Sequence, residues 1–385
     1  MLVLQKELDK NETEVYDRSR IDFLEGKNMK VWNKIMVLLL AFSMTIAVTS
    51  CGKSGDGEMG NTGGSSSEFG FDGENVPYER LENGTVNFGS YPQTRVMDEE
   101  LTALLLETVD ETPSEGSEKW ISYGYYADGE NETEYMWYCD VIHEDVKYRA
   151  VYFEEYRPNH TFAPSSVNCQ QENGYEVELV YWFQWEALNW IVLEEGDGSA
   201  FLHCNSIIDA QEYYSHRDNR VINGEKIYAN NYKQSNIRKW LNEIFYETAF
   251  TAAEQRYIQS TLLDNSEKST NPNGNPLYWN NGVNEYACED TEDKVFLLSY
   301  EEITNPAYGF EGAAKDRNSS DYAKSQGCYF YRLTGTVKYV SPWWLRSPFY
   351  GHDDAVQNLD YYNENNYYYV HYTECGVCPA LWLRL

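Results

Sequence analysis

The sequence has few basic residues and no apolar run long enough to cross a membrane comfortably. Lysine and arginine number 30 against 62 aspartate and glutamate residues, which gives a formal net charge of −32. Because phosphate groups are bound by clusters of basic side chains, this composition excludes nucleic acid as a partner. It also disfavours docking onto anionic lipid headgroups. The longest apolar run, residues 35–48, is shorter than the ~20 residues that a spanning helix needs.

The common catalytic and metal-binding signatures are absent from the sequence as well. It contains no nucleotide-binding loop, zinc-protease helix, nucleophile elbow or EF-hand loop, and its six histidines are scattered. We therefore expect no cofactor, no metal site and no assignable catalytic residue. His203 lies in an apolar run, which favours a core position. The 62 acidic residues are too many for any pair to be singled out as a glycosidase acid and base.

Cysteine is sparse and irregularly spaced. Seven of the eight cysteines follow Cys51, an odd number with no repeated spacing, so a disulfide framework is not indicated. Cys375 and Cys378 form a lone C-x-x-C without a second pair or zinc-finger histidines. This pattern favours two ordinary thiols near a strand over a redox or metal pair.

The segment before Cys51 is typical of a bacterial lipoprotein signal peptide. Lys30 and Lys34 precede the apolar run, and the small residues Thr49 and Ser50 precede the cysteine. We expect a diacylglyceryl group on Cys51, which would hold the protein to the outer face of the cell membrane. Residues 29–50 are then the signal peptide. Residues 1–28 are too polar for it and indicate a misassigned start upstream of Met29, the alternative being a genuine cytoplasmic extension.

The rest of the chain divides by composition. Residues 51–84 begin with a segment rich in glycine, serine and acidic residues, which predicts a flexible, lipidated tether. Residues 85–385 predict one large globular domain of the α+β class, rich in twisted antiparallel strands, with two central helices and long loops. Strands are expected from β-branched and aromatic content at residues 86–88, 148–153, 179–183, 190–193, 200–204 and 294–298.

Both predicted helices lie near the middle of the chain. Ser235 is placed to cap a helix over residues 235–245, in which Trp240, Leu241 and Phe245 recur on the inward face. A capping box that begins at Thr251 predicts a second helix over residues 251–262.

Several segments in order over some 300 residues resemble the bacterial domain of unknown function family 6273. The closing pieces, WLRSP at residues 344–348 and GVCPALWL at 376–383, are the most distinctive, although Cys378 stands where the family usually has arginine. The resemblance implies no established activity. The close is also loosely similar to C-type-lectin-type and formylglycine-generating-type domains, which implies a lectin-like fold. The other matching segments are residues 86–94, 147–153, 181–183, 190–193, 207–210, 236–242 and 293–299.

A segment rich in tyrosine, asparagine, aspartate and histidine, residues 350–372, is the candidate ligand-binding surface. Tyrosine gives large contact area and asparagine gives adaptable hydrogen bonding. One interpretation is a tyrosine-rich loop from an AT-rich gene, and the other is a binding loop diversified at adenine-rich codons. Alternation predicts that Tyr368, Val370 and Tyr372 face inward. The candidate binding residues are Tyr350, His352, Asp353, Asp354, Tyr361, Tyr362, Asn363, Asn365, Tyr367, Tyr369 and His371.

Together these features predict a lipid-anchored cell-surface protein whose domain binds an extracellular glycan or peptide. The rival is an extracellular enzyme, either a cell-wall hydrolase or an oxygenase of the formylglycine-generating type that uses Cys375 or Cys378. A binding module predicts a shallow aromatic face, whereas an enzyme predicts convergent polar groups in a deep cleft.

Overall fold

The computed structural model describes residues 78–109, 112–113, 117–128, 131–157, 168–270, 284–332, 339–360 and 366–385. The chain divides into two units, Met1–Ser67 and Glu68–Leu385, and every described residue belongs to the second. The predicted signal peptide, Cys51 and most of the predicted tether therefore lie outside the described residues. The first strand, at Glu79–Arg80, precedes the predicted domain start at about residue 85.

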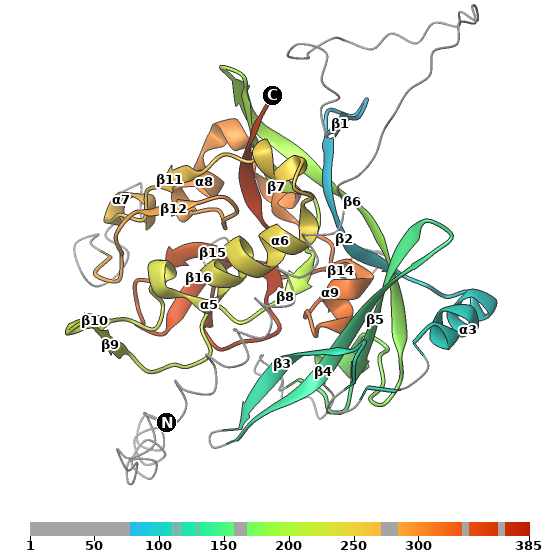
Figure 1. Cartoon of the computed structure of the whole chain (residues 1–385). Coiled ribbons are helices and arrows are strands. Elements are labelled where there is room, and N and C mark those ends of the chain that lie inside the picture. Colours follow the sequence, from blue (N-terminus) through green and yellow to red (C-terminus); the bar gives the residue numbers. More distant parts are fainter. Residues whose placement is uncertain are drawn as a thin grey trace, which may run out of the picture. The chain divides into compact units, whose positions relative to one another are not determined.

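A curled antiparallel sheet, shaped like half a barrel, contains most of the strands that precede residue 205 (Figure 1). Its strand order is β1-β2-β6-β5-β4-β3, and β7 continues it by pairing with β6 on one side and β19 on the other. The bounds are β1 Glu79–Arg80, β2 Val86–Arg95, β3 Ile121–Asp128, β4 Asn131–His143, β5 Val146–Phe153, β6 Tyr181–Gly196, β7 Ser199–Cys204 and β19 Ala380–Arg384.

Strand β6 is the longest member of this sheet and joins two predicted strands into one. Residues 179–183 and 190–193 were expected as separate strands, but the chain between them stays extended because it pairs with β2, with Glu186 opposite Tyr91. The polar residues of this stretch gave no local strand signal. Pairing with residues of β2, such as Tyr91 opposite Glu186, therefore decides that this stretch is extended.

Tight turns with left-handed backbone close three hairpins. In the β4–β5 turn, Glu144 and Asp145 have φ of 48° and 64°. Asp197–Gly198 joins β6 to β7, and Asn223–Gly224 joins β9 (Arg220–Ile222) to β10 (Glu225–Ile227), again with positive φ throughout. Two-residue turns with both φ values positive match the right-handed twist of the flanking strands.

A second sheet lies in the C-terminal half and has the order β17-β16-β15-β18-β8. Strand β15 pairs antiparallel with β16 and parallel with β18, and β17 lies at an edge. Its bounds are β8 Asp209–Ala210, β15 Trp343–Pro348, β16 Ala355–Leu359, β17 Asn366–Tyr369 and β18 Gly376–Val377. Two further hairpins pair β11 (Thr261–Leu263) with β12 (Thr291–Asp293), and β13 (Tyr331–Arg332) with β14 (Tyr339–Val340).

The first predicted helix is confirmed. It consists of α5 (Asn236–Lys239), a π-helical stretch (Trp240–Phe245) and α6 (Tyr246–Ala249). The Ser235 side chain caps it by accepting a bond from the backbone N–H of Arg238 at 3.2 Å. Leu241 and Phe245 are fully buried, and Trp240 packs half-buried beside Phe245. The remaining α-helices among the described residues are α3 Glu99–Glu107, α4 Cys169–Glu172, α7 Glu267–Thr270, α8 Tyr300–Thr304 and α9 Asp321–Ser325.

The second predicted helix, over residues 251–262, is wrong. The capping box does form, since Thr251 N–H donates to Glu254 Oε2 at 2.7 Å and Glu254 N–H donates to Thr251 Oγ1 at 3.3 Å. Only one 3₁₀ turn follows, at Glu254–Arg256. The chain then extends because Ile258 bridges Leu383 and because the following residues pair as β11 with β12.

The strand predicted over residues 294–298 is also wrong. Only Phe296 makes a bridge there, with Ala380 as its partner. The apolar run is nevertheless buried, since each residue from Val295 to Leu298 has 0% exposure. Burial alone accounts for its composition, and periodicity cannot separate a short buried strand from a buried irregular segment.

We call the continuous helix from α5 to α6, residues 236–249, the central helix. The core is dominated by aromatic side chains that lie between the two sheets and this helix. Trp190 and Trp344 are fully buried within it. A smaller second core forms under α3, where Leu105 meets Trp120 and Trp182. The main core requires glycine at position 89. Its φ is +71°, and an added Cβ would lie 2.5 Å from the Phe250 ring.

Candidate functional site

The predicted alternation begins in strand β17 and continues past its end at Tyr369. Tyr368 and Val370 are buried at 1% and 0% exposure, as predicted. Tyr372, predicted to be buried with them, is half-buried. On the other face, Tyr367, Tyr369 and His371 are half-buried instead of freely exposed, because they stack on one another and on neighbouring rings.

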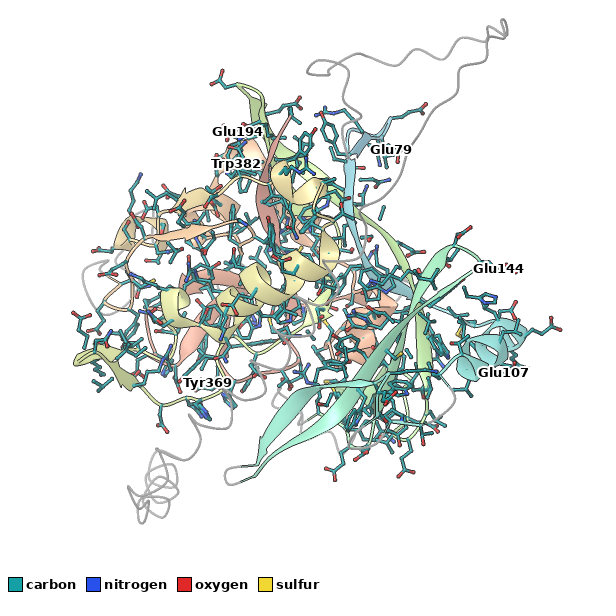
Figure 2. The ribbon with its side chains drawn as sticks, in the orientation of Figure 1. Glu79, Glu107, Glu144, Glu194, Tyr369 and Trp382 are labelled. Atoms are coloured by element: carbon teal, nitrogen blue, oxygen red, sulfur yellow. The ribbon has the colours of Figure 1, made fainter. Side chains whose placement is uncertain are left out.

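These side chains belong to an aromatic patch that β17 shares with the loop after β15. Phe349 lies parallel to Tyr367, with ring centroids 4.0 Å apart. His352, which is exposed, lies 5.6 Å from Tyr367 and 6.1 Å from Tyr369. We call this surface the aromatic patch; Tyr369 locates it in Figure 2. Its rings are Phe349, Tyr350, His352, Tyr367, Tyr369, His371 and Tyr372.

An arginine from a distant segment completes the aromatic patch. The Arg217 guanidinium lies over the Tyr369 ring at 4.0 Å, and its Nε donates to Asp354 Oδ2 at 2.6 Å. Partial burial lowers the pKa of Arg217, but the bond and the charge of Asp354 more than offset this and raise it above its ordinary value. Arg217 is therefore a permanent cation stacked on an aromatic platform.

The loop that carries His352 is tied down by two asparagines. Asn230 Nδ2 donates to the carbonyl oxygens of His352 and Ala355, at 2.9 and 3.0 Å. Asn219 Nδ2 donates to the Asp353 carboxylate. Because backbone and side chain are both anchored, the loop presents His352 from a fixed position.

The structure thus places Tyr350, His352, Tyr367, Tyr369 and His371 together in the aromatic patch. The other predicted positions differ. Asp353 is half-buried beside the patch, whereas Asp354 is buried beneath Arg217 as its ion-pair partner. Tyr361, Tyr362, Asn363, Asn365 and the lipidation residue Cys51 lie outside the described residues.

Sequence reasoning missed Arg217, Asn219, Asn230 and Phe349. Arg217 stands 137 residues before its partner Asp354, so no local spacing could connect the two. Phe349 could have been predicted from the sequence, since it lies directly between the closing motif WLRSP and the tyrosine-rich segment.

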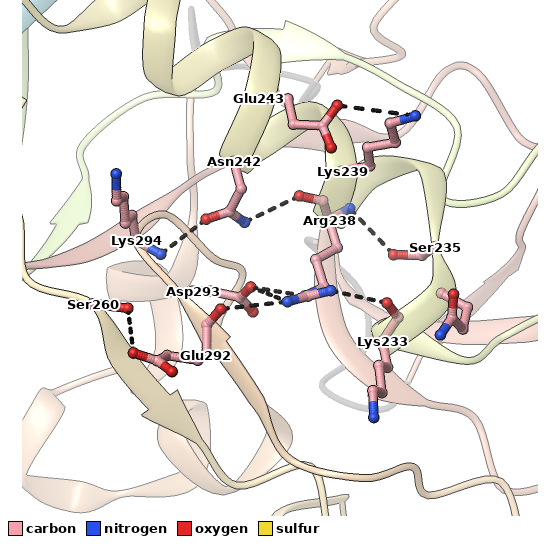
Figure 3. A pocket seen from close by; sticks show the side chains of 11 residues that line it. Lys233, Ser235, Arg238, Lys239, Asn242, Glu243, Ser260, Glu292, Asp293 and Lys294 are labelled. Carbon is pink, nitrogen blue, oxygen red and sulfur yellow. Dashed lines mark hydrogen bonds and ion pairs between the residues drawn. The ribbon is translucent and has the colours of Figure 1, made fainter. Parts of the chain in front are cut away.

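A separate hollow of about 430 Å³ lies between the start of the central helix and the β11–β12 hairpin (Figure 3). Arg238 crosses it to Asp293 at 2.7 Å, and Ser260 Oγ donates to Glu292 at 2.9 Å. Asn242 bonds at both ends of its amide, to the Arg238 and Val295 carbonyls and to the Lys294 N–H. Because these side chains bond to one another and to nearby backbone, their hydrogen bonds hold the central helix against strands β11 and β12.

The two thiols of the C-x-x-C motif are buried in the core. Cys375 and Cys378 both have 0% exposure, and burial raises the pKa of each thiol. Cys378 Sγ donates to the Cys204 carbonyl oxygen at 3.1 Å. Inaccessible thiols with raised pKa are poor nucleophiles.

Two further features are absent from the described residues. No cluster of three or more histidine, cysteine or acidic side chains there could hold a metal ion. In the same part of the chain, no helix is both long and apolar enough to cross a membrane.

Residues 197–385 match the model of a protein family described as Domain of unknown function (DUF6273). This region is therefore assigned to the DUF6273 family. No curated protein and no solved structure matches the chain. The matched region runs from the β6–β7 turn to the last residue, so the aromatic patch and the central helix lie in the DUF6273 region. Strands β1 to β6 precede it.

The closing motif of the DUF6273 region has a structural role here. Arg346 of WLRSP is buried at 4% exposure, where it binds the Glu302 carboxylate and donates to the Leu297 carbonyl oxygen at 2.8 Å. Glu302 also completes the capping box of α8 with Ser299. Arg346 therefore joins β15 to α8 and is not exposed for catalysis.

Proposed function

We propose that this protein is a lipid-anchored cell-surface protein that binds an extracellular glycan through the aromatic patch. The observation that carries the proposal is the stacking of Phe349, Tyr367, Tyr369 and His352 on one surface. Sugar rings present C–H faces that pack on aromatic rings, and their hydroxyl groups bond to imidazole, amide and carboxylate groups. Tyrosine and asparagine supply such contacts at low entropic cost.

The fixed geometry of the aromatic patch supports a recognition role. Asn230 and Asn219 hold the His352 loop, and the rings of β17 stand on the buried side chains of Tyr368 and Val370. A surface that is ordered before the ligand arrives loses less conformational entropy on binding.

The location in the proposal rests on the sequence. The signal peptide places a lipid on Cys51, which is the link to the membrane, and the glycine- and serine-rich segment after it separates the domain from the anchor. The acidic surface suits an exterior, solvated protein. The likeness of the closing segment to C-type-lectin-type domains stays part of this proposal, as a hypothesis about the fold and the ligand class.

Binding is favoured over catalysis by the state of the candidate reactive groups. Cys375 and Cys378, which an oxygenase of the formylglycine-generating type would use, are buried. Asp353 and Asp354, two carboxylates beside the aromatic patch, are bonded to Asn219 and Arg217. These pairings leave neither carboxylate poised as a general acid or base.

A glycan array followed by titration tests the proposal. The wild-type domain should bind at least one oligosaccharide, and His352→Ala should weaken that binding about tenfold, equivalent to about 1.4 kcal/mol. Tyr367→Leu should weaken it similarly, because apolar bulk remains while the ring face is lost. Ile142→Ala, at a residue 73% exposed on β4, is the matched surface control and should leave affinity unchanged. An array without any bound glycan, or equal losses in the control, would contradict the proposal.

A further inference from the structure

The Arg217 side chain presents unused hydrogen-bond donors at the aromatic patch. Only its Nε is engaged, by Asp354, and its Nη1 and Nη2 form no hydrogen bond with any described residue. The Arg217 side chain is 50% exposed, whereas that of Asp354 is 12% exposed. The buried carboxylate therefore fixes one edge of the guanidinium while the other edge stays accessible.

This guanidinium is held in one orientation from two sides. The Tyr369 ring supports its face at 4.0 Å, and Asp354 is itself fixed by its carbonyl oxygen, which accepts from the Val370 N–H at 2.9 Å. A planar fork held in this way matches the two oxygens of a carboxylate and forms two parallel bonds without further ordering.

A second arginine lies along the same segment. Arg220 stacks on Tyr214 with its guanidinium 3.9 Å from the ring centroid, and Tyr214 N–H donates to the Val370 carbonyl oxygen. Two tyrosine-stacked arginines thus flank the C-terminal end of β17. Asp354 balances part of this charge, so the accessible Nη atoms of Arg217 are the donors that a ligand anion can reach.

We propose that the ligand of the aromatic patch is an acidic glycan, whose uronate carboxylate binds the free edge of Arg217 while its sugar rings stack on Tyr367, Tyr369 and His352. This inference rests on the glycan-binding function proposed above and specifies its ligand class. The acidic surface repels polyanions at long range, so a carboxylate is accepted only where fixed cations offset that field. The arginine fork supplies the charge complementarity, and the stacked rings supply the contact area.

The test begins with an array that carries both uronate-containing and neutral oligosaccharides. Titrations then compare oligogalacturonides with their methyl esters, which keep the same sugar rings and lose the negative charge. The wild type should bind the free acid at least about tenfold more tightly, since hydrogen bonds to charged groups are stronger than those to neutral groups. The readout is the ratio of acid affinity to ester affinity, which Arg217→Gln should lower to about one whatever its effect on overall affinity, and Arg217→Lys should keep part of the preference.

The matched control is Arg256→Gln, which removes one positive charge from an exposed residue outside the aromatic patch and should retain the full preference. Thermal unfolding of each variant shows whether the fold is intact. Array binding by neutral glycans alone, or equal affinity for acid and ester, overturns this inference and leaves the proposed function standing. Two outcomes overturn both this inference and the proposed function. One is that no glycan binds, and the other is that only acidic peptides are captured through Arg217.

Discussion

Buried cations of the DUF6273 region are balanced in different ways. Arg346 meets the Glu302 carboxylate, whereas Arg317, at 3% exposure, has no carboxylate partner among the described residues. Arg317 instead donates to the backbone oxygens of Ala314 and Asp316, and its Nη2 lies 3.2 Å from His203 Nδ1. Because the guanidinium can only donate, His203 Nδ1 must accept, so the imidazole is neutral.

The neutral state of His203 predicts a loss of stability in mild acid. Burial, and then the Arg317 charge, lower its pKa well below the ordinary value, whereas the unfolded chain titrates at about 6.5. The contribution of His203 is therefore complete above about pH 6.5. It falls at lower pH because the unfolded state binds a proton that the folded state does not.

Urea unfolding at about pH 7.5 and 5.5 measures this effect, with a loss of about 1 kcal/mol expected from His203. The variant His203→Gln should be less stable at both values, since it alters a buried contact, but should show a smaller difference between them. Equal pH dependence in the two proteins would contradict a neutral buried imidazole.

At the scale of elements, local pattern predicted the structure wherever local contacts decide it. Strands β5 and β7 and the helix capped by Ser235 were predicted because β-branched and aromatic content, 3.6-residue spacing and a capping side chain are local signals. The continuity of β6 was not predicted, since residues 184–189 are extended by their pairing with β2. The predicted helix over residues 251–262 failed for the same reason.

The extended course of residues 258–263 gives two neighbouring apolar residues opposite surroundings. Ile258 is 7% exposed and bridges Leu383, whereas Leu262 is 71% exposed. An amphipathic helix would have placed these residues, four apart, on one buried face. Ile258→Ala should therefore lower the free energy of unfolding by about 2–4 kcal/mol, and Leu262→Ala should change it by less than about 0.5 kcal/mol. Chemical denaturation of the two variants measures this, and equal losses would support the helix.

In the candidate site, too, some features follow from local pattern and others from contacts between distant segments. Inward-facing Tyr368 and Val370 followed from the alternation along β17, and the surface role of the opposite face followed from its tyrosines. Arg217, which sets the charge of the aromatic patch, could not be predicted, since only the folded chain brings it to Asp354 and Tyr369. Asp354 was predicted as a ligand-binding residue, and the structure places it as the buried partner of that arginine.

At the scale of the whole molecule, the DUF6273 region and the strands before it share one core. Strand β7 pairs with β6 on one side and with the closing strand β19 on the other. Phe88 of β2 and Leu381 of β19 belong to the same buried cluster. The segment before residue 197 therefore supplies part of the support for the region that the family model matches.

The last prediction concerns the attachment of this domain to the membrane. Radiolabelled fatty acid should mark the wild-type protein, which should sediment with the membrane fraction, because two acyl chains anchor a protein stably. Cys51→Ala should abolish the label and leave the precursor unprocessed or release the protein. Cys288→Ala, which removes a different thiol, should behave as the wild type. Translation from Met1 instead of Met29 would be visible as a larger precursor. An unlabelled wild type with initiation at Met29 confirmed would refute the anchor, since the signal peptide would then end without lipid transfer to Cys51.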